Sequence, residues 1–148
     1  MPEICASGQN SNLPYVLMIK RIGHFLIAYW PSLFVGAGIV YLSLFHAASL
    51  QLDVSNPDKF SHLVAYLVWT CCLTGDLWRD RIPFNRRVFW GLIFPIIFGG
   101  IIELLQAYFF PPRAGEWLDW YADFSGTVLG FVMLDVLCRF FPPKPKHS

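Results

Sequence analysis

Residues 88–110 have the sequence VFWGLIFPIIFGGIIELLQAYFF, a long apolar run that is interrupted by Glu103 and Gln106. An α-helix rises about 1.5 Å per residue, so about 20 residues cross the roughly 30 Å hydrocarbon layer of a membrane. This segment is long enough to do so, and Glu103 is the charged residue within it. It therefore predicts a transmembrane helix.

Three further apolar segments extend the pattern along the chain. They are residues 25–45, 62–78 and 122–141. The middle one of these is short, and we expect it to depend on burial between its neighbours. The sequence thus predicts an all-α membrane protein, a four-transmembrane-helix bundle over residues 25–141, with an N-terminal cytoplasmic tail (1–24) and a Pro/Lys-rich tail (142–148).

The composition agrees with a membrane protein and excludes several other classes. The 148-residue chain is 55% hydrophobic and 14% charged, and its mean hydropathy is +0.48, whereas soluble domains are about 25% charged. The net charge is +1 and no basic stripe carries interleaved aromatics, so we expect no nucleic-acid partner. The four cysteines lack metal-ligand spacing and predict no disulfide framework.

The segment 25–45 also has to be distinguished from a cleaved leader. Its apolar stretch exceeds the roughly 7–15 residues of a signal-peptide core, so we expect it to stay in the protein as a span. We expect residues 1–17 to be a flexible tail or to precede the true start. Met1 and Met18 are both candidate start residues.

The number of Lys and Arg residues alternates between the segments that connect the spans. Cytoplasmic segments of membrane proteins are enriched in these residues. The N-terminal tail carries Lys20 and Arg21, and the first loop carries Lys59. The second loop carries Arg79, Arg81, Arg86 and Arg87, and the third carries Arg113. The C-terminal end carries Arg139, Lys144 and Lys146. This alternation predicts that both termini and the second loop face the cytoplasm.

With that orientation, polar residues from four regions of the chain meet at the outer face. The candidate ligand-binding residues are Asp58, Lys59, His62, Glu103, Gln106, Arg113, Asp119 and Asp123. Because Phe110 marks the end of its span, Glu103 lies about 10 Å deep. An ionisable group at that depth is costly unless it faces the bundle. We therefore expect Glu103 to point inward, toward His62, Lys59 or Arg113.

A structural reading competes with this one for individual residues. Polar residues at span ends often anchor helices at the headgroups, and Asp58, Glu116 and Asp119 fit that role. Asp76 and Asp135 are expected to form local salt bridges with Arg79 and Arg139.

Small residues and prolines indicate where helices pack closely or bend. Gly126 and Gly130 form a G-x-x-x-G step, suited either to dimerisation or to packing within one chain. Gly99 and Gly100 would let a neighbour approach near the Glu103 turn. Pro31 and Pro95 are expected to kink their helices.

The ordered set of polar residues resembles VanZ-like membrane proteins, a family named for a protein that gives low-level resistance to the glycopeptide teicoplanin. The set comprises Asp58-Lys59-x-x-His62, Glu103-x-x-Gln106, Arg113 and Asp119-x-x-Ala122-Asp123-x-x-Gly126. The resemblance covers about residues 25–140 and implies the cytoplasmic (inner) membrane of a bacterial cell envelope. One position departs from it, because the family usually has Asn where this chain has Asp123.

Three functions remain open from the sequence. In the first, the outer pocket binds a lipid-linked or cell-wall precursor, with Lys59 and Arg113 holding its anionic part. In the second, the protein is a membrane hydrolase or transferase. In the third, the polar cluster is a structural scaffold that locks the helices together.

The catalytic candidates of the second function are His62, Glu103 and Arg113. His62 would act as general base or nucleophile, Asp58 or Glu103 would orient it, and Arg113 would stabilise developing charge. A carboxylate–His–Arg set is also chemically able to hold a divalent metal. The spacing of the sequence assigns no metal ligand and no cofactor, and membrane lipids are the partner it implies.

Overall fold

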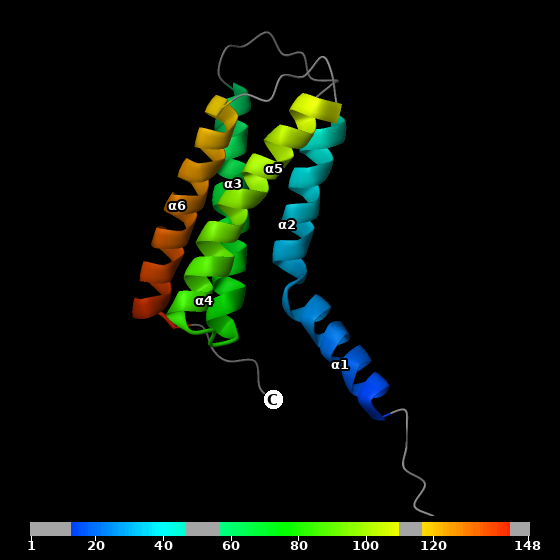
Figure 1. Ribbon diagram of the computed structural model, residues 1–148. Helices are drawn as coiled ribbons and strands as arrows, with labels where there is room; N and C mark the ends of the chain where they lie inside the picture. The colour runs from blue at the N-terminus through cyan, green and yellow to red at the C-terminus, as the bar shows by residue number, and fades with distance from the viewer. Residues whose placement is uncertain (1–12, 47–56, 110–116, 143–148) are drawn as a thin grey trace, which may run out of the picture.

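The computed structural model describes residues 13–46, 57–109 and 117–142, and every regular element in these ranges is helical (Figure 1). The elements are α1 (Leu13–Ala28), α2 (Trp30–Tyr41), the π-helical turn η1 (Leu42–His46), α3 (Pro57–Arg79), α4 (Phe84–Val88), the π-helical turn η2 (Phe89–Ile93), α5 (Phe94–Phe109) and α6 (Trp117–Phe140). The predicted all-α architecture is therefore confirmed.

Three of the helical runs are long and apolar enough to cross a membrane. They are α3, the continuous run of α4, η2 and α5 over Phe84–Phe109, and α6. The pair α1 and α2 brings the total to four if it forms one broken span, since the two helices meet at an angle of 72°. The protein is thus a multi-pass helical membrane protein.

The distribution of side chains is that of a protein surrounded by lipid. Large apolar residues cover the outside, as Phe34 (74% exposed) and Leu104 (56%) illustrate. The inside holds polar residues beside a small apolar core around Trp69 and Ile102, and Thr70, Thr74 and Thr127 are completely buried. This arrangement suits hydrocarbon solvent, in which polar groups are costly unless they face the bundle.

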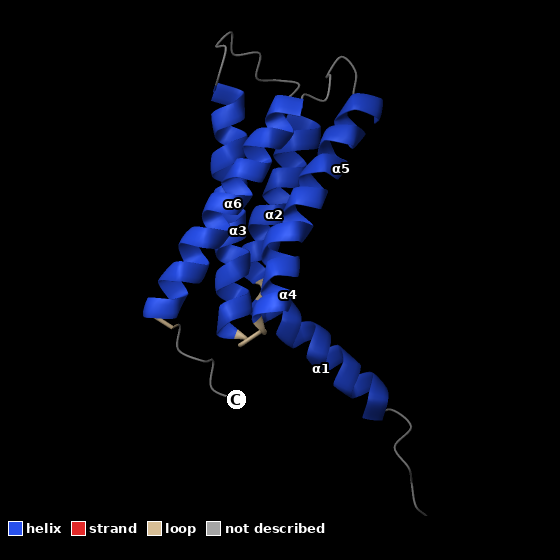
Figure 2. Ribbon diagram, turned by 60° about the vertical axis from the view of Figure 1, so that its left-hand side comes forward, coloured by secondary structure: helices blue, strands red, loops and turns tan. Residues whose placement is uncertain are grey.

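Helices α3 and α6 lie side by side along their length and form the most extensive helix pair of the bundle, with α6 at its edge (Figures 1 and 2). A β-carbon on Gly126 would lie 2.2 Å from the Leu63 carbonyl oxygen, and one on Gly130 would lie 2.7 Å from the Leu67 carbonyl oxygen. The G-x-x-x-G step therefore serves packing within the chain, where it lets the two backbones approach each other.

The first predicted span is not one straight helix. The structure divides it at Tyr29, and α1 leaves the bundle at the lower end in both ribbon views (Figures 1 and 2). Pro31 explains the break, because proline has no N–H and its ring clashes with the carbonyl group four residues earlier. The structure also differs from the predicted tail, since α1 begins at Leu13.

The second predicted span is longer than its apolar core. Residues 62–78 are part of α3, which runs from Pro57 to Arg79 and has 23 residues. Its first turn carries polar residues, which lower the hydropathy without ending the helix. The span is therefore longer than the predicted segment, and Lys59–Arg79 is long and apolar enough to cross a membrane. It also packs against α2 and α6.

Ion pairs join the helices at the end of the bundle where α3 and α6 finish. Asp76 binds Arg79 at 2.9 Å and Asp135 binds Arg139 at 2.8 Å, which confirms both predicted local pairs. Asp135 also accepts hydrogen bonds from Trp78 (2.8 Å) and Arg87 (3.2 and 3.3 Å), so it links α6 to α3 and α4. The carboxylate therefore acts between helices as well as within one.

Candidate functional site

A second group of polar side chains lies at the opposite end of the bundle, where α3 and α6 begin and α5 ends. It consists of His62 on α3, Glu103 on α5, and Asp119 and Asp123 on α6. We call these four residues the polar cluster. Their exposed fractions are 8%, 8%, 6% and 1%, respectively. Burial of so many ionisable groups in a membrane protein is costly, and such groups are by default candidates for function.

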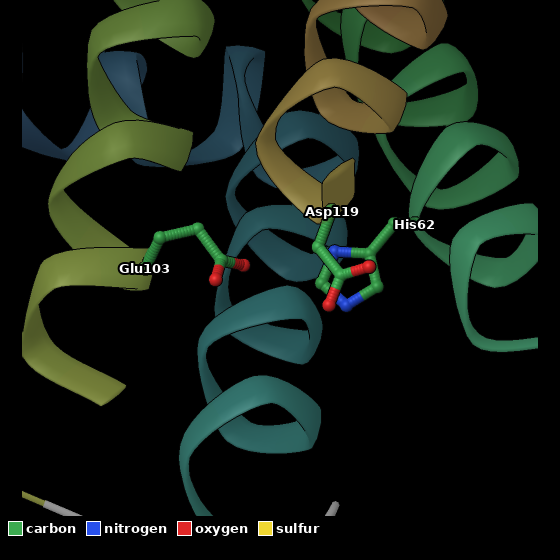
Figure 3. Close-up of side chains that lie close together, drawn as sticks. All are labelled: His62, Glu103 and Asp119. Atoms are coloured by element: carbon green, nitrogen blue, oxygen red, sulfur yellow. The ribbon is translucent and has the colours of Figure 1, made fainter. Parts of the chain in front are cut away.

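The histidine is held by one carboxylate and faces two others. His62 Nδ1 lies 2.9 Å from Asp123 Oδ1. One ligand atom each from His62, Glu103 and Asp119 lies within 4.8 Å of the other two. Figure 3 shows the Glu103 carboxyl group pointing from α5 toward His62 and Asp119. The prediction that Glu103 points inward, toward His62, is confirmed.

Glycines on α6 and α5 position the cluster. Gly126 and Gly130 bring α6 against α3, and Asp123 lies one turn before Gly126 on the same buried face. Gly99 lies one turn before Glu103 on α5, and a β-carbon there would be 2.9 Å from Asp123 Oδ2. A side chain at position 99 would therefore push Asp123 away from its place beside His62.

Lys59 and Gln106 have different places relative to the cluster. Lys59 Nζ lies 3.8 Å from Asp119 Oδ1 at its edge, so the structure brings this lysine to the site. Gln106 is buried, but its side-chain amide donates to the Ser43 carbonyl oxygen at 2.8 Å. It therefore ties α5 to η1. Arg113, Glu116 and the side chain of Asp58 lie outside the described residues.

The structure adds two polar residues that sequence reasoning missed. Tyr66 (1% exposed) and Thr127 (0%) lie one helical turn below His62 and Asp123, respectively. Neither hydroxyl has a hydrogen-bond partner among the described residues. Their spacing of four from a cluster residue is the signal that would have placed them on the same helix faces.

An apolar groove of about 510 Å³ leads to the cluster along α5 and α6. Its walls include Ile97, Ile101 and Trp120, and Ala107 is one of its small lining residues. Glu103 belongs to this lining as well as to the polar cluster. A second apolar cavity, of about 590 Å³, lies between α2 and the helices α3 and α5, and its lining does not include residues of the cluster.

Comparison with known proteins finds no matching family model, no matching curated protein and no matching solved structure. The geometry of the site itself indicates its chemistry. A buried imidazole backed by a carboxylate can accept or donate a proton, and the remaining carboxylates can accept hydrogen bonds from hydroxyl or ammonium groups. An apolar groove beside them suits a hydrocarbon chain.

Proposed function

We propose that the protein is a VanZ-like integral membrane protein of the bacterial cell envelope that binds the headgroup of a lipid-linked cell-wall precursor. The observation that carries this proposal is the position of Glu103, which lines the apolar groove and also belongs to the buried polar cluster. A ligand that fills both must have a hydrocarbon chain joined directly to a polar group. A lipid-linked precursor has this form.

The charges of the site indicate how such a headgroup would be held. Glu103, Asp119 and Asp123 accept hydrogen bonds from the hydroxyl and amine groups of a sugar–peptide headgroup. Lys59, at the edge of the cluster, and Arg113, from the third loop, bind its phosphate groups, for which an arginine offers a planar fork of donors. In the proposed orientation this end of the bundle faces the outside of the inner membrane.

The test uses purified protein in detergent and the polyprenyl-diphosphate disaccharide-pentapeptide precursor of peptidoglycan as the probe. Native mass spectrometry and the melting temperature report binding. We expect Ala107→Trp, which fills the groove beside Glu103, to weaken binding about tenfold or more, which corresponds to about 1.4 kcal/mol or more. Arg113→Ala should weaken it without changing protein abundance.

The chain offers a matched control for the groove. Ala37 is an exposed alanine that lines the second cavity, so Ala37→Trp adds the same bulk away from the polar cluster and should leave binding unchanged. Equal effects of the two tryptophans, or equal binding of undecaprenol, which lacks a charged headgroup, would contradict the proposal.

The pairing of His62 with Asp123 favours an enzymatic alternative. A carboxylate 2.9 Å from an imidazole nitrogen fixes the ring and supports its action as a general base. In that case the protein is a hydrolase or transferase, and His62→Ala abolishes turnover of the same lipid-linked precursor while binding survives. Mass spectrometry of the lipid after incubation with the native protein distinguishes this function from binding alone.

A further inference from the structure

We propose that His62, Glu103 and Asp119 bind a divalent transition-metal ion such as Zn²⁺, with Asp123 as the residue that orients the imidazole. This site goes beyond the proposed lipid binding and does not depend on it, because the ion and its ligands are tested on the protein alone. One ligand atom from each of the three residues lies within 4.8 Å of the others. Two atoms that ligate one Zn²⁺ ion at about 2.2 Å lie at most about 4.4 Å apart, so small side-chain shifts would bring all three to a single ion.

The donor atoms of the three residues suit a transition-metal ion. An imidazole nitrogen and two carboxylate oxygens form a mixed N/O set, which is typical of Zn²⁺ at distances of about 2.0–2.2 Å. Three protein ligands would leave at least one coordination position open for water or for an oxygen of a substrate, as in catalytic zinc sites. The three residues come from three different helices, α3, α5 and α6.

A carboxylate lies beside the histidine ring. In metal sites, the ligating imidazole commonly donates its other N–H to a carboxylate, which fixes the tautomer and turns the free nitrogen toward the ion. Asp123 Oδ1 lies 2.9 Å from His62 Nδ1 and has this position. In the proposed site, Nδ1 is the donor to Asp123 and Nε2 is the nitrogen that binds the metal.

A further buried polar group, the hydroxyl of Tyr66, lies at the same place. The Tyr66 hydroxyl is buried and has no hydrogen-bond partner among the described residues. It lies 3.3 Å from the point that a β-carbon of Gly99 would occupy, and Asp123 Oδ2 lies 2.9 Å from that same point. The hydroxyl thus faces the cluster, where a water molecule on the metal or the Asp123 carboxylate could engage it.

Charge also favours a cation. The described residues of the cluster bring three carboxylates together around one imidazole, with Lys59 at the edge beside Asp119. Like charges at such separations in a lipid-surrounded bundle repel each other strongly. A divalent ion among them would offset that repulsion and would let the same cluster accept a phosphate oxygen.

The experiment measures Zn²⁺ binding to the full chain, purified in detergent with a tag that lacks histidine and stripped with EDTA. Isothermal titration calorimetry should show one Zn²⁺ per chain, and Zn²⁺ should raise the melting temperature. Glu103→Gln and Asp119→Asn keep the shape of each side chain and should abolish this binding. Asp123→Asn keeps an acceptor for the imidazole and should weaken binding about 10–100-fold.

Controls separate the site from other zinc ligands. Asp76→Asn removes a buried carboxylate at the opposite end of the bundle and should leave Zn²⁺ affinity unchanged. Co²⁺ in place of Zn²⁺ should give visible absorption bands of an N/O site, which disappear in His62→Ala. Zn²⁺ binding that survives in all the cluster variants, or that is lost when Cys71 and Cys72 are replaced by serine, would overturn the proposal.

Discussion

Gly126 is a residue at which the packing of the bundle leaves no space for a side chain. A β-carbon there would lie 2.2 Å from the Leu63 carbonyl oxygen and 3.1 Å from the Leu67 nitrogen, both of them backbone atoms of α3. Backbone atoms cannot move aside as a flexible side chain can. Any side chain at position 126 must therefore push α6 away from α3, and with it Asp123 away from His62.

We expect Gly126→Ala to lower the free energy of unfolding by about 2–3 kcal/mol, the upper part of the range for overpacked cores. Unfolding in a denaturing detergent such as sodium dodecyl sulfate measures this. Gly38→Ala is the matched control, because Gly38 is also helical but a β-carbon there meets nothing within 4 Å. The control should be neutral or slightly stabilising, since alanine favours helices by about 1 kcal/mol over glycine.

Asp135 binds two arginines that differ in burial. Arg87 is 8% exposed, lies with its guanidinium 4.0 Å from the centre of the Trp78 ring, and pairs with Asp135 at 3.2 Å. Arg139 pairs with the same carboxylate from one turn away, and its side chain is 57% exposed. A buried charge that loses its partner is expensive, whereas an exposed pair contributes little.

Asp135→Ala should therefore cost about 3–5 kcal/mol of stability, because it leaves the Arg87 charge buried without this partner. Arg139→Ala should cost less than about 1 kcal/mol. The melting temperatures of the two variants in the same detergent test this difference. Similar losses would mean that the link between α4 and α6 contributes no more than the local pair on α6.

At the scale of elements, the sequence predicted which segments are helical better than where they end or bend. Hydropathy located α3, α5 and α6, because a run of about 20 mostly apolar residues is typical of a membrane-spanning helix. It missed the first turn of α3, where Lys59 and Ser61 are polar. It also missed the break at Tyr29, since a sum of side-chain hydrophobicities carries no information about the direction of the backbone.

The candidate site was predictable in part for a related reason. The cost of burying Glu103 showed that it points inward, and helical spacing brought His62 to the same level. The pairing of His62 with Asp123 was not predicted, although Asp123 shares a face with Gly126 and Gly130. Gln106 shares a helix with Glu103, but its side chain contacts Ser43. That contact depends on the position of η1, which the residue spacing on α5 does not predict.

The bend between α1 and α2 has two physical supports. Pro31 lies in the first turn of α2 and cannot continue the hydrogen-bond pattern of α1. Arg79 of α3 donates a hydrogen bond to the Ala28 carbonyl oxygen, the last residue of α1. A cation at this position also interacts favourably with the negative end of the α1 dipole.

Pro31→Ala should straighten the pair toward one continuous helix. Spin labels at Leu17 and Leu42, both exposed, would be about 37 Å apart in a straight helix and about 30 Å apart at the observed bend of 72°. Double electron–electron resonance measures the difference. An unchanged distance in Pro31→Ala would assign the bend to Arg79, which Arg79→Ala then tests.

At the scale of the whole molecule, the polar groups are divided between two ends with different roles. At one end, arginines pair with Asp76 and Asp135 and join neighbouring helices. At the other end, acidic groups and His62 gather beside an apolar groove. The first arrangement holds neighbouring helices together, and the second has the composition that we expect of a binding site. The side of the membrane that each end faces therefore decides which ligands can reach the polar cluster.

We expect the arginine-rich end to face the cytoplasm, because Arg79, Arg81, Arg86 and Arg87 lie within a few residues of each other and positive charge is enriched on that side. In a chain whose native cysteines are replaced by serine, Asn85→Cys and Trp117→Cys place exposed thiols at opposite ends. A membrane-impermeant maleimide should label position 117 in intact spheroplasts and position 85 after lysis. The reverse pattern would turn the cluster toward the cytoplasm and would remove access to ligands on the outer side of the membrane.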